Sequence, residues 1–173
     1  MPIFVISGPP ASGKTTLSRV LLTHFERGLH IPVDDLRQWV KGGLADSFDW
    51  SEETERQFQI AESAAADVAK RYSEAGFAVA MDHCRNLPRM ETVVREYLDG
   101  LDVVKVVLLP DLQTNLVRNR ERIDKDFDPK LLDSLIESTN AAYRQDIAAG
   151  WIALDSGRFS PEELAAILLK IRD

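Results

Sequence analysis

Short apolar runs alternate with longer stretches in which apolar and polar residues repeat at helical spacing. Five of the short runs are rich in β-branched and other apolar residues and end at turn-forming or polar residues, a pattern typical of buried strands. These predicted strands cover residues 2–7, 29–33, 77–82, 102–110 and 151–156. The run at 29–33 is the weakest, because Pro32 is tolerated only at a sheet edge or a strand end.

The stretches between the strands predict helices. In residues 14–25 the apolar side chains stand at positions 17, 20, 21 and 25, one face of a helix. Further helices are expected at about 51–76, 86–100, 128–150 and 160–173, and at the start of 112–129, which then becomes dense in charge. Strand and helix alternate five times, so we predict one α/β domain with a parallel sheet between helices on both faces.

Composition narrows the class of protein. The 173 residues suit a single domain with a real core. No apolar run approaches the roughly 20 residues of a membrane span, and the N-terminus lacks the basic start and cleavage site of a secretory signal. The single cysteine excludes an internal disulfide, so a cytoplasmic location is expected. The formal net charge of −7 argues mildly against a long nucleic acid partner, which usually binds a basic surface.

The segment GPPASGKT, residues 8–15, fits the phosphate-loop pattern G-x-x-x-x-G-K-[ST] between a strand and a helix. Glycines at its fixed positions allow backbone angles that turn the loop amides toward phosphate oxygens. We expect Lys14 to reach the β- and γ-phosphates and the Thr15 hydroxyl to bind Mg²⁺. The predicted nucleotide-binding residues are Gly8, Ala11, Ser12, Gly13, Lys14, Thr15 and Thr16.

Phosphate-loop proteins either hydrolyse nucleotide or transfer its phosphoryl group. The GTPase motifs D-x-x-G and N-K-x-D do not occur in this sequence. Many ATPases end a strand with Asp-Glu, the Glu orienting the attacking water, whereas the run here ends with Asp82 and His83. Asp82 remains a candidate Mg²⁺ ligand, directly or through water, and the missing Glu favours transfer.

The segment IPVDDLRQ, residues 31–38, places two carboxylates just past the second strand, at the sheet edge where α/β proteins bind ligands. Transfer to a hydroxyl needs a carboxylate within hydrogen-bond reach of its proton. Asp34 or Asp35 meets this need, and Arg37 is a candidate contact for the acceptor. The alternative is a helix cap with acids in its first turn.

The segment LVRNRER, residues 116–122, carries Arg118 and Arg122 four positions apart on one helical face. Arginines there would stabilise charge that develops on the transferred phosphoryl group. Arg120 points elsewhere on a regular helix and is the weaker candidate. The alternative is a solvated, charged helix surface.

Taken together and in this order, these segments resemble the small P-loop kinases that phosphorylate hydroxyl groups. The pattern is most similar to 5′-hydroxyl polynucleotide kinase domains and chloramphenicol phosphotransferase, and more distantly to gluconate, shikimate and adenylylsulfate kinases. The resemblance spans nearly the whole chain. It implies a three-layer P-loop fold with strand order 2-3-1-4-5, with ATP and Mg²⁺ as donor and cofactor.

The resemblance also implies residue roles. On the VDDLRQ match Asp34 is the general base and Arg37 an acceptor contact, and on AMDHCRNLPRM the match brings in Asp82 and Asn86. LVRNRER is similar to an R-N-x-x-R lid, which we expect at about residues 118–130. The closing WIALDSGRFSPEEL resembles the segment that borders adenine in many of these kinases.

Residues 38–58 would cover the acceptor in this architecture. They include Trp39, Phe48 and Trp50, which either stack on the acceptor or pack the segment onto the core, and for each residue we favour packing. His83 and Cys84 follow Asp82 and could face the acceptor, although we interpret Cys84 as a small buried hydrophobe.

Three functional hypotheses follow. The leading one is an ATP-dependent kinase of a small molecule such as an antibiotic, sugar or nucleoside. The second is a 5′-hydroxyl polynucleotide kinase, which the acidic net charge disfavours. The third is a nucleotide-binding ATPase or switch that transfers nothing to an acceptor. The sequence indicates neither the acceptor nor the oligomeric state.

Overall fold

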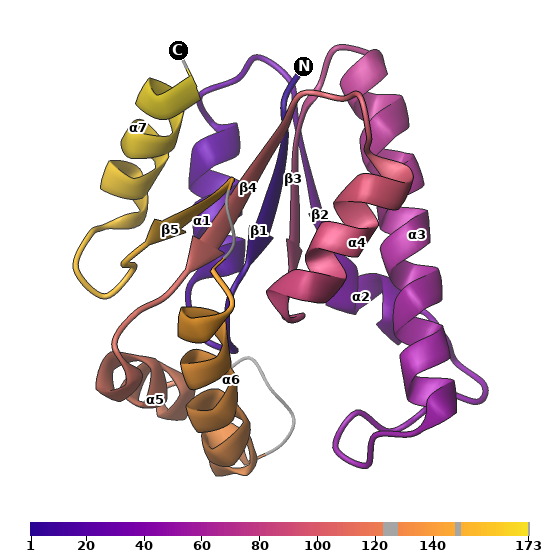
Figure 1. Ribbon diagram of the computed structural model, residues 1–173, viewed down its shortest axis with the longest axis vertical. Coiled ribbons are helices and arrows are strands. Elements are labelled where there is room, and N and C mark those ends of the chain that lie inside the picture. The colour runs from indigo at the N-terminus through magenta and orange to yellow at the C-terminus, as the bar shows by residue number, and fades with distance from the viewer. Residues whose placement is uncertain (123–127, 148–149, 173) are drawn as a thin grey trace.

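The computed structural model, which describes residues 1–122, 128–147 and 150–172, is built on one parallel sheet flanked by helices (Figure 1). The strands run in the order β2-β3-β1-β4-β5, and each neighbouring pair is parallel. Their bounds are β1 Ile3–Ser7, β2 Gly28–Pro32, β3 Ala78–His83, β4 Val103–Leu108 and β5 Trp151–Leu154. The predicted fold class and strand order are confirmed.

The helices form the two outer layers. One sheet face packs against α3 and α4, and the other packs against α1 and α7 (Figure 1). The helices are α1 Lys14–Leu22, α2 Val33–Gln38, α3 Glu52–Glu74, α4 Leu87–Tyr97, α5 Leu112–Arg120, α6 Asp133–Gln145 and α7 Pro161–Arg172, with a 3₁₀ helix η1 at Pro129–Leu132. Within the described ranges, no helix is long and apolar enough to cross a membrane.

The central strand β1 explains why its sequence is an unbroken apolar run. Successive side chains of a strand point to opposite faces. Ile3 and Val5 therefore enter the core beneath α3 and α4, while Phe4 and Ile6 enter the core beneath α1 and α7. All four are fully buried, as expected for a parallel sheet covered on both faces.

Two local features differ from the prediction. Residues 33–38 form the short helix α2, which is too short for a periodic signal. Only the alternative interpretation, a helix start with acids in its first turn, foresaw it, and Asp34 and Asp35 do lie in that turn. The helix expected over 128–150 is divided into η1 and α6, with the Asp128 side chain accepting a hydrogen bond from the Lys130 amide at the start of η1. The middle of the expected lid, residues 123–127, lies outside the described residues.

Candidate active site

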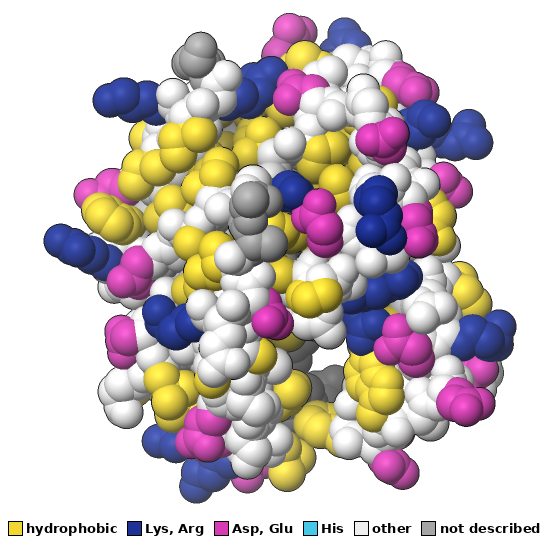
Figure 2. Space-filling view, in the orientation of Figure 1, with side chains coloured by type: hydrophobic (Ala, Val, Ile, Leu, Met, Phe, Trp, Pro, Cys, Tyr) yellow, Lys and Arg dark blue, Asp and Glu magenta, His cyan; other side chains and the backbone are white. Residues whose placement is uncertain are grey.

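A cleft of about 980 Å³ opens at the carboxyl edge of the sheet. Figure 2 shows a hollow at the lower end of the molecule, between the part that carries α5 and α6 and the part that carries the start of α3. All predicted site residues except Gly8 and Ser12 line the cleft: Ala11, Gly13, Lys14, Thr15, Thr16, Asp34, Asp35, Arg37, Asp82, Asn86, Arg118 and Arg122. Its volume suits a nucleotide and a second small ligand together.

The loop between β1 and α1 has the backbone of a phosphate cradle. Gly8 has a φ of 148°, and a Cβ built there would lie 2.5 Å from the Leu108 carbonyl oxygen, so only glycine fits. Gly13, at the start of α1, has a φ of 94°, and no side chain of the described residues caps this helix end. The amides of the first turn are therefore directed at the cleft, where the helix dipole favours an anion.

Changing Gly8 to alanine tests this cradle. The left-handed backbone and the contact with the Leu108 carbonyl should together lower the free energy of unfolding by roughly 2 kcal/mol or more. The loop should also lose ATP affinity, which equilibrium binding measures alongside denaturant unfolding. Gly42→Ala is the matched control, since a Cβ there meets no atom within 4 Å. Equal stability of the two variants would show that the loop tolerates a Cβ at position 8.

Lys14 and two distant side chains hold the loop in shape. The Lys14 Nζ donates to the carbonyls of Gly8 and Pro9 at 2.9 and 2.8 Å, and its side chain is almost buried. Asn115 of α5 donates to the Pro10 carbonyl at 2.6 Å, and the Ser156 hydroxyl donates to the Ser12 carbonyl at 2.6 Å. The loop is thereby preorganised by Lys14 and by contacts from two other parts of the chain.

Asp82, the last residue but one of β3, lies beneath this loop. Its Oδ1 lies 3.5 Å from the Thr15 hydroxyl, and its Oδ2 lies 3.5 Å from the Ser18 hydroxyl and 2.5 Å from Nε2 of His30. The carboxylate is buried but borders the cleft. Asp82 and Thr15 therefore lie side by side, as two oxygen ligands of one Mg²⁺ would have to.

The next residue along β3 faces the other side of the sheet. His83 is fully buried against α3, so the expectation that it faces the acceptor is wrong. Its Nδ1 lies 3.1 Å from Oδ1 of Asp34, and its Nε2 lies 3.3 Å from Oε1 of Glu62. The Nδ1–Oδ1 contact has an ion-pair distance, but Nδ1 has no well-aligned hydrogen-bond acceptor among the described residues.

Glu62 is the centre of a buried charge network. Its two oxygens accept from Nε of Arg85 at 3.0 Å and from Nε of Arg89 at 2.7 Å, and Arg85 also reaches Glu55 at 2.7 Å. Burial would raise the pKa of Glu62, but His83 and the two arginines outweigh it and hold that pKa below its ordinary value. Burial would likewise lower the pKa of His83, and the Asp34 and Glu62 carboxylates raise it instead.

Aromatic side chains form part of the lining of the cleft. Trp50 stacks on Phe58 with ring centroids 5.1 Å apart, and the Arg37 guanidinium lies 4.5 Å from the Phe58 ring. Phe48 and Trp50 line the cleft and are 57% and 49% exposed, while Trp39 is 71% exposed and lies outside the lining. Packing onto the core was therefore the wrong expectation for Trp39 and Phe48, and only partly right for Trp50.

Arg37 connects this part of the lining to the segment that follows α2. Its guanidinium is buried and donates to the Ala45 carbonyl and, at 3.3 Å, to the Ser47 hydroxyl. These bonds hold the predicted acceptor-covering segment against α2. A direct contact between Arg37 and the acceptor stays a prediction.

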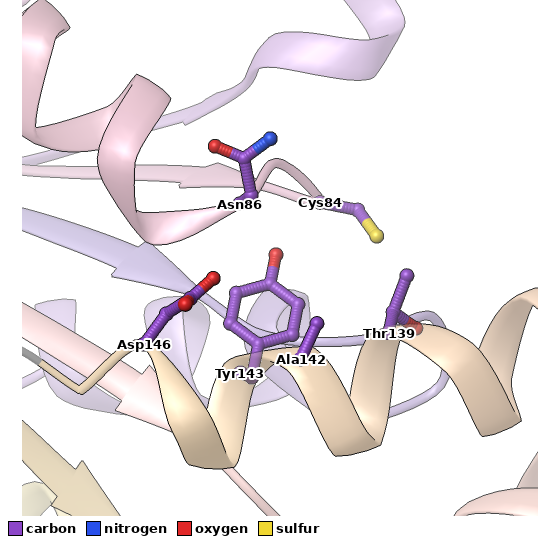
Figure 3. A pocket seen from close by; sticks show the side chains of 6 residues that line it. All are labelled: Cys84, Asn86, Thr139, Ala142, Tyr143 and Asp146. Atoms are coloured by element: carbon purple, nitrogen blue, oxygen red, sulfur yellow. The ribbon is translucent and has the colours of Figure 1, made fainter.

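A smaller cavity of about 50 Å³ adjoins the cleft between α6 and the end of β3 (Figure 3). It is lined by Cys84, Asn86, Thr139, Ala142, Tyr143 and Asp146. The Tyr143 hydroxyl points from α6 to the end of β3, where it donates to the Arg85 carbonyl and lies 3.0 Å from the Ser7 hydroxyl. Cys84 is only partly buried, so it borders the cleft instead of filling the core.

Asn86 and the arginines of α5 have described contacts within the protein. Asn86 caps α4 by accepting a hydrogen bond from the Arg89 amide, while still bordering the cleft. Arg118 donates to the Ser156 carbonyl at 2.8 Å, which places it beside the segment expected to border adenine. Arg120 points away and pairs with Asp133, as expected. Arg118 and Arg122 both line the cleft, and their contact with phosphates stays a prediction.

Comparison with known proteins identifies the family of this chain. Residues 2–171 match the family described as chloramphenicol phosphotransferase-like protein. The chain belongs to this family. The match covers almost the whole chain and confirms the resemblance seen in its motifs, and membership supports a small-molecule phosphotransferase. Among curated proteins, no sequence matches the chain significantly.

Solved structures share the fold of this family member. The tunicamycin resistance protein of Deinococcus radiodurans superimposes with a TM-score of 0.69 at 16% identity, covering 99% of this chain and 95% of that one. A sugar kinase from a Janibacter species gives 0.69 at 20%, covering 98% and 93%. The shikimate kinase of Acinetobacter baumannii, solved with shikimate, gives 0.60 at 19%, covering 99% and 92%.

Two residues of the site were not predicted, although the sequence contains a feature that points to each of them. Glu62 stands four positions after Phe58 and four before Ala66, on the apolar stripe of α3, where an acid must find a buried partner. His30 lies two positions before Pro32 on β2, and the register Pro32–Asp82 places its side chain on the same sheet face as Asp82.

Proposed function

We propose that this protein transfers the γ-phosphoryl group of ATP to a hydroxyl group of a small-molecule acceptor. The observation that carries the proposal is that the phosphate loop and Asp34 line the same cleft. Family membership supports the phosphotransferase class, and the absence of an Asp-Glu strand end in the sequence favours transfer over hydrolysis.

Different residues of the cleft accept the proton and stabilise the negative charge during transfer. Asp34 accepts the proton of the acceptor hydroxyl as its oxygen attacks the γ-phosphorus. The bond from that phosphorus to the β–γ bridging oxygen breaks, and ADP leaves with the bond's electron pair. Lys14, the loop amides and the two arginines Arg118 and Arg122 stabilise the negative charge on the transferred group. The choice of Asp34 over Asp35 is supported by the contact of Asp34 with His83.

The donor set around the loop fits Mg²⁺. Thr15 Oγ1 and Asp82 Oδ1 are hard oxygen ligands 3.5 Å apart, at the mouth of a cradle that accepts phosphates. When bound by Thr15 and Asp82, the ion supplies positive charge that neutralises the phosphate oxygens. His30 holds the other oxygen of Asp82 and so fixes the direction of the carboxylate.

Changing His30 to alanine should therefore raise the Mg²⁺ concentration needed for half-maximal rate by about 10-fold, the usual effect of losing a partner behind a metal ligand. Titrating Mg²⁺ at saturating ATP measures the effect. His24→Ala is the matched control, because His24 is exposed and outside the cleft. An unchanged Mg²⁺ requirement in the His30 variant would remove His30 from the site.

The acceptor side of the cleft favours a small molecule with an apolar or aromatic portion. The lining of the cleft includes three aromatic side chains, Phe48, Trp50 and Phe58, and two leucines, Leu132 and Leu135. Incubation with Mg²⁺-ATP and a panel of hydroxyl compounds, followed by mass spectrometry, tests the proposal. The panel should hold hydroxylated antibiotics, sugars, nucleosides and 5′-hydroxyl oligonucleotides. Phosphorylation of oligonucleotides alone would replace the proposal with a polynucleotide kinase.

A further inference from the structure

The proposed transfer leaves the buried histidine of β3 without a role. His83 is fully buried, yet its two ring nitrogens face two carboxylates, Asp34 on α2 and Glu62 on α3. Phe58 lies against the ring, with centroids 5.6 Å apart. A buried histidine that only fills space has no need of two acids, since each buried charge carries a desolvation cost.

The two acids differ in how firmly they are held. Glu62 is 1% exposed and fixed by Arg85 and Arg89, whereas the Asp34 side chain is 54% exposed on the six-residue helix α2. An exposed carboxylate samples several rotamers unless a partner selects one. His83 connects the buried acid to the exposed one.

We propose that Glu62 and His83 are positioning residues that hold the Asp34 carboxylate in the direction of the acceptor hydroxyl. This inference rests on the proposed function, in which Asp34 is the base. Glu62 fixes the ring through Nε2, and Nδ1 then presents its proton to Oδ1 of Asp34. The imperfect alignment of the Nδ1 contact is of the kind that tightens when substrate completes a site.

Two substitutions separate this positioning role from a merely structural one. The amide nitrogen of His83→Asn takes the place of Nδ1 and keeps the donor for Asp34, whereas that of His83→Gln takes the place of Nε2 and keeps the donor for Glu62. We expect His83→Gln to lower kcat by about 10²-fold with little change in KM for ATP, the usual cost of a misplaced catalytic group. His83→Asn loses the contact with Glu62 but keeps the donor for Asp34, so it should retain a larger share of kcat than His83→Gln. If the histidine only supports the buried network, the order reverses, and that result overturns the proposal.

A second pair of variants keeps the proposal testable if both histidine variants unfold. Glu62→Gln weakens the hold on His83, while Glu55→Gln changes another acid of α3 that also binds Arg85 but does not touch His83. Glu62→Gln should lower kcat at a temperature where it is fully folded, and Glu55→Gln should not. Equal kcat in the two variants overturns the proposal that Glu62 and His83 position Asp34. Asp34→Asn distinguishes the two failures, because full turnover of that variant would refute the proposed base itself.

Discussion

Replacing Asp34 with asparagine should lower kcat by about 10²–10⁴-fold, the range that a general base contributes to catalysis. Asparagine has nearly the same shape as aspartate but cannot accept the proton of the acceptor hydroxyl. Asp34 lies on α2 and is no part of the phosphate loop, so the affinity for ATP should stay at the wild-type value. Steady-state kinetics with an acceptor that the wild-type protein phosphorylates, together with equilibrium ATP binding, measures both effects.

Asp35→Asn provides the matched control. Asp35 is the neighbouring acid on α2 and also lines the cleft, but no described contact joins it to His83. We expect this variant to keep most of the wild-type kcat. If Asp35→Asn is the inactive variant and Asp34→Asn remains active, the assignment of the base is reversed.

Replacing Lys14 with methionine should lower kcat by about 10²–10³-fold, the usual cost of removing one preorganised donor from a developing charge. Methionine retains the unbranched stem but not the ammonium group. The Gly8 and Pro9 carbonyls would also lose their donor, so the loop should become less ordered and ATP affinity should fall as well. Kinetics, ATP binding and thermal unfolding together separate these effects.

Lys70→Met is the control for Lys14→Met. Lys70 is an exposed lysine of α3 that does not line the cleft, and its replacement removes the same charge from the protein. We expect wild-type kinetics from this variant. Wild-type turnover in Lys14→Met would contradict the placement of the γ-phosphoryl group at this loop.

The phosphate loop and the alternation of strand and helix could be predicted because both are local patterns. Gly8, Gly13 and Lys14 stand at fixed spacing, and the loop geometry follows from that spacing. The strand order came from resemblance, since no local pattern states which strands are neighbours. The order brings β3 next to β1, and it thereby places Asp82 beneath Thr15.

The charge network could not be predicted because its members are far apart in sequence. Glu62 and His83 are 21 positions apart and meet only because α3 packs on the face of β3 that carries His83. The exposure of Phe48 and Trp50 was missed for a related reason. The segment after α2 is held by Arg37 and Gln57 through backbone carbonyls, so its aromatic rings remain at the cleft instead of entering the core.

Transfer of a phosphoryl group from ATP to an acceptor in the cleft is tested best by the ratio of phosphorylated acceptor to ADP. Both products should be quantified in one reaction, with wild-type protein and with Asp34→Asn, once the panel has identified an acceptor. We expect one molecule of phosphorylated acceptor for each molecule of ADP and little ADP when the acceptor is left out. The Asp34→Asn variant should form neither product. ADP that forms at the same rate with or without any acceptor would contradict this transfer and indicate an ATPase or a switch.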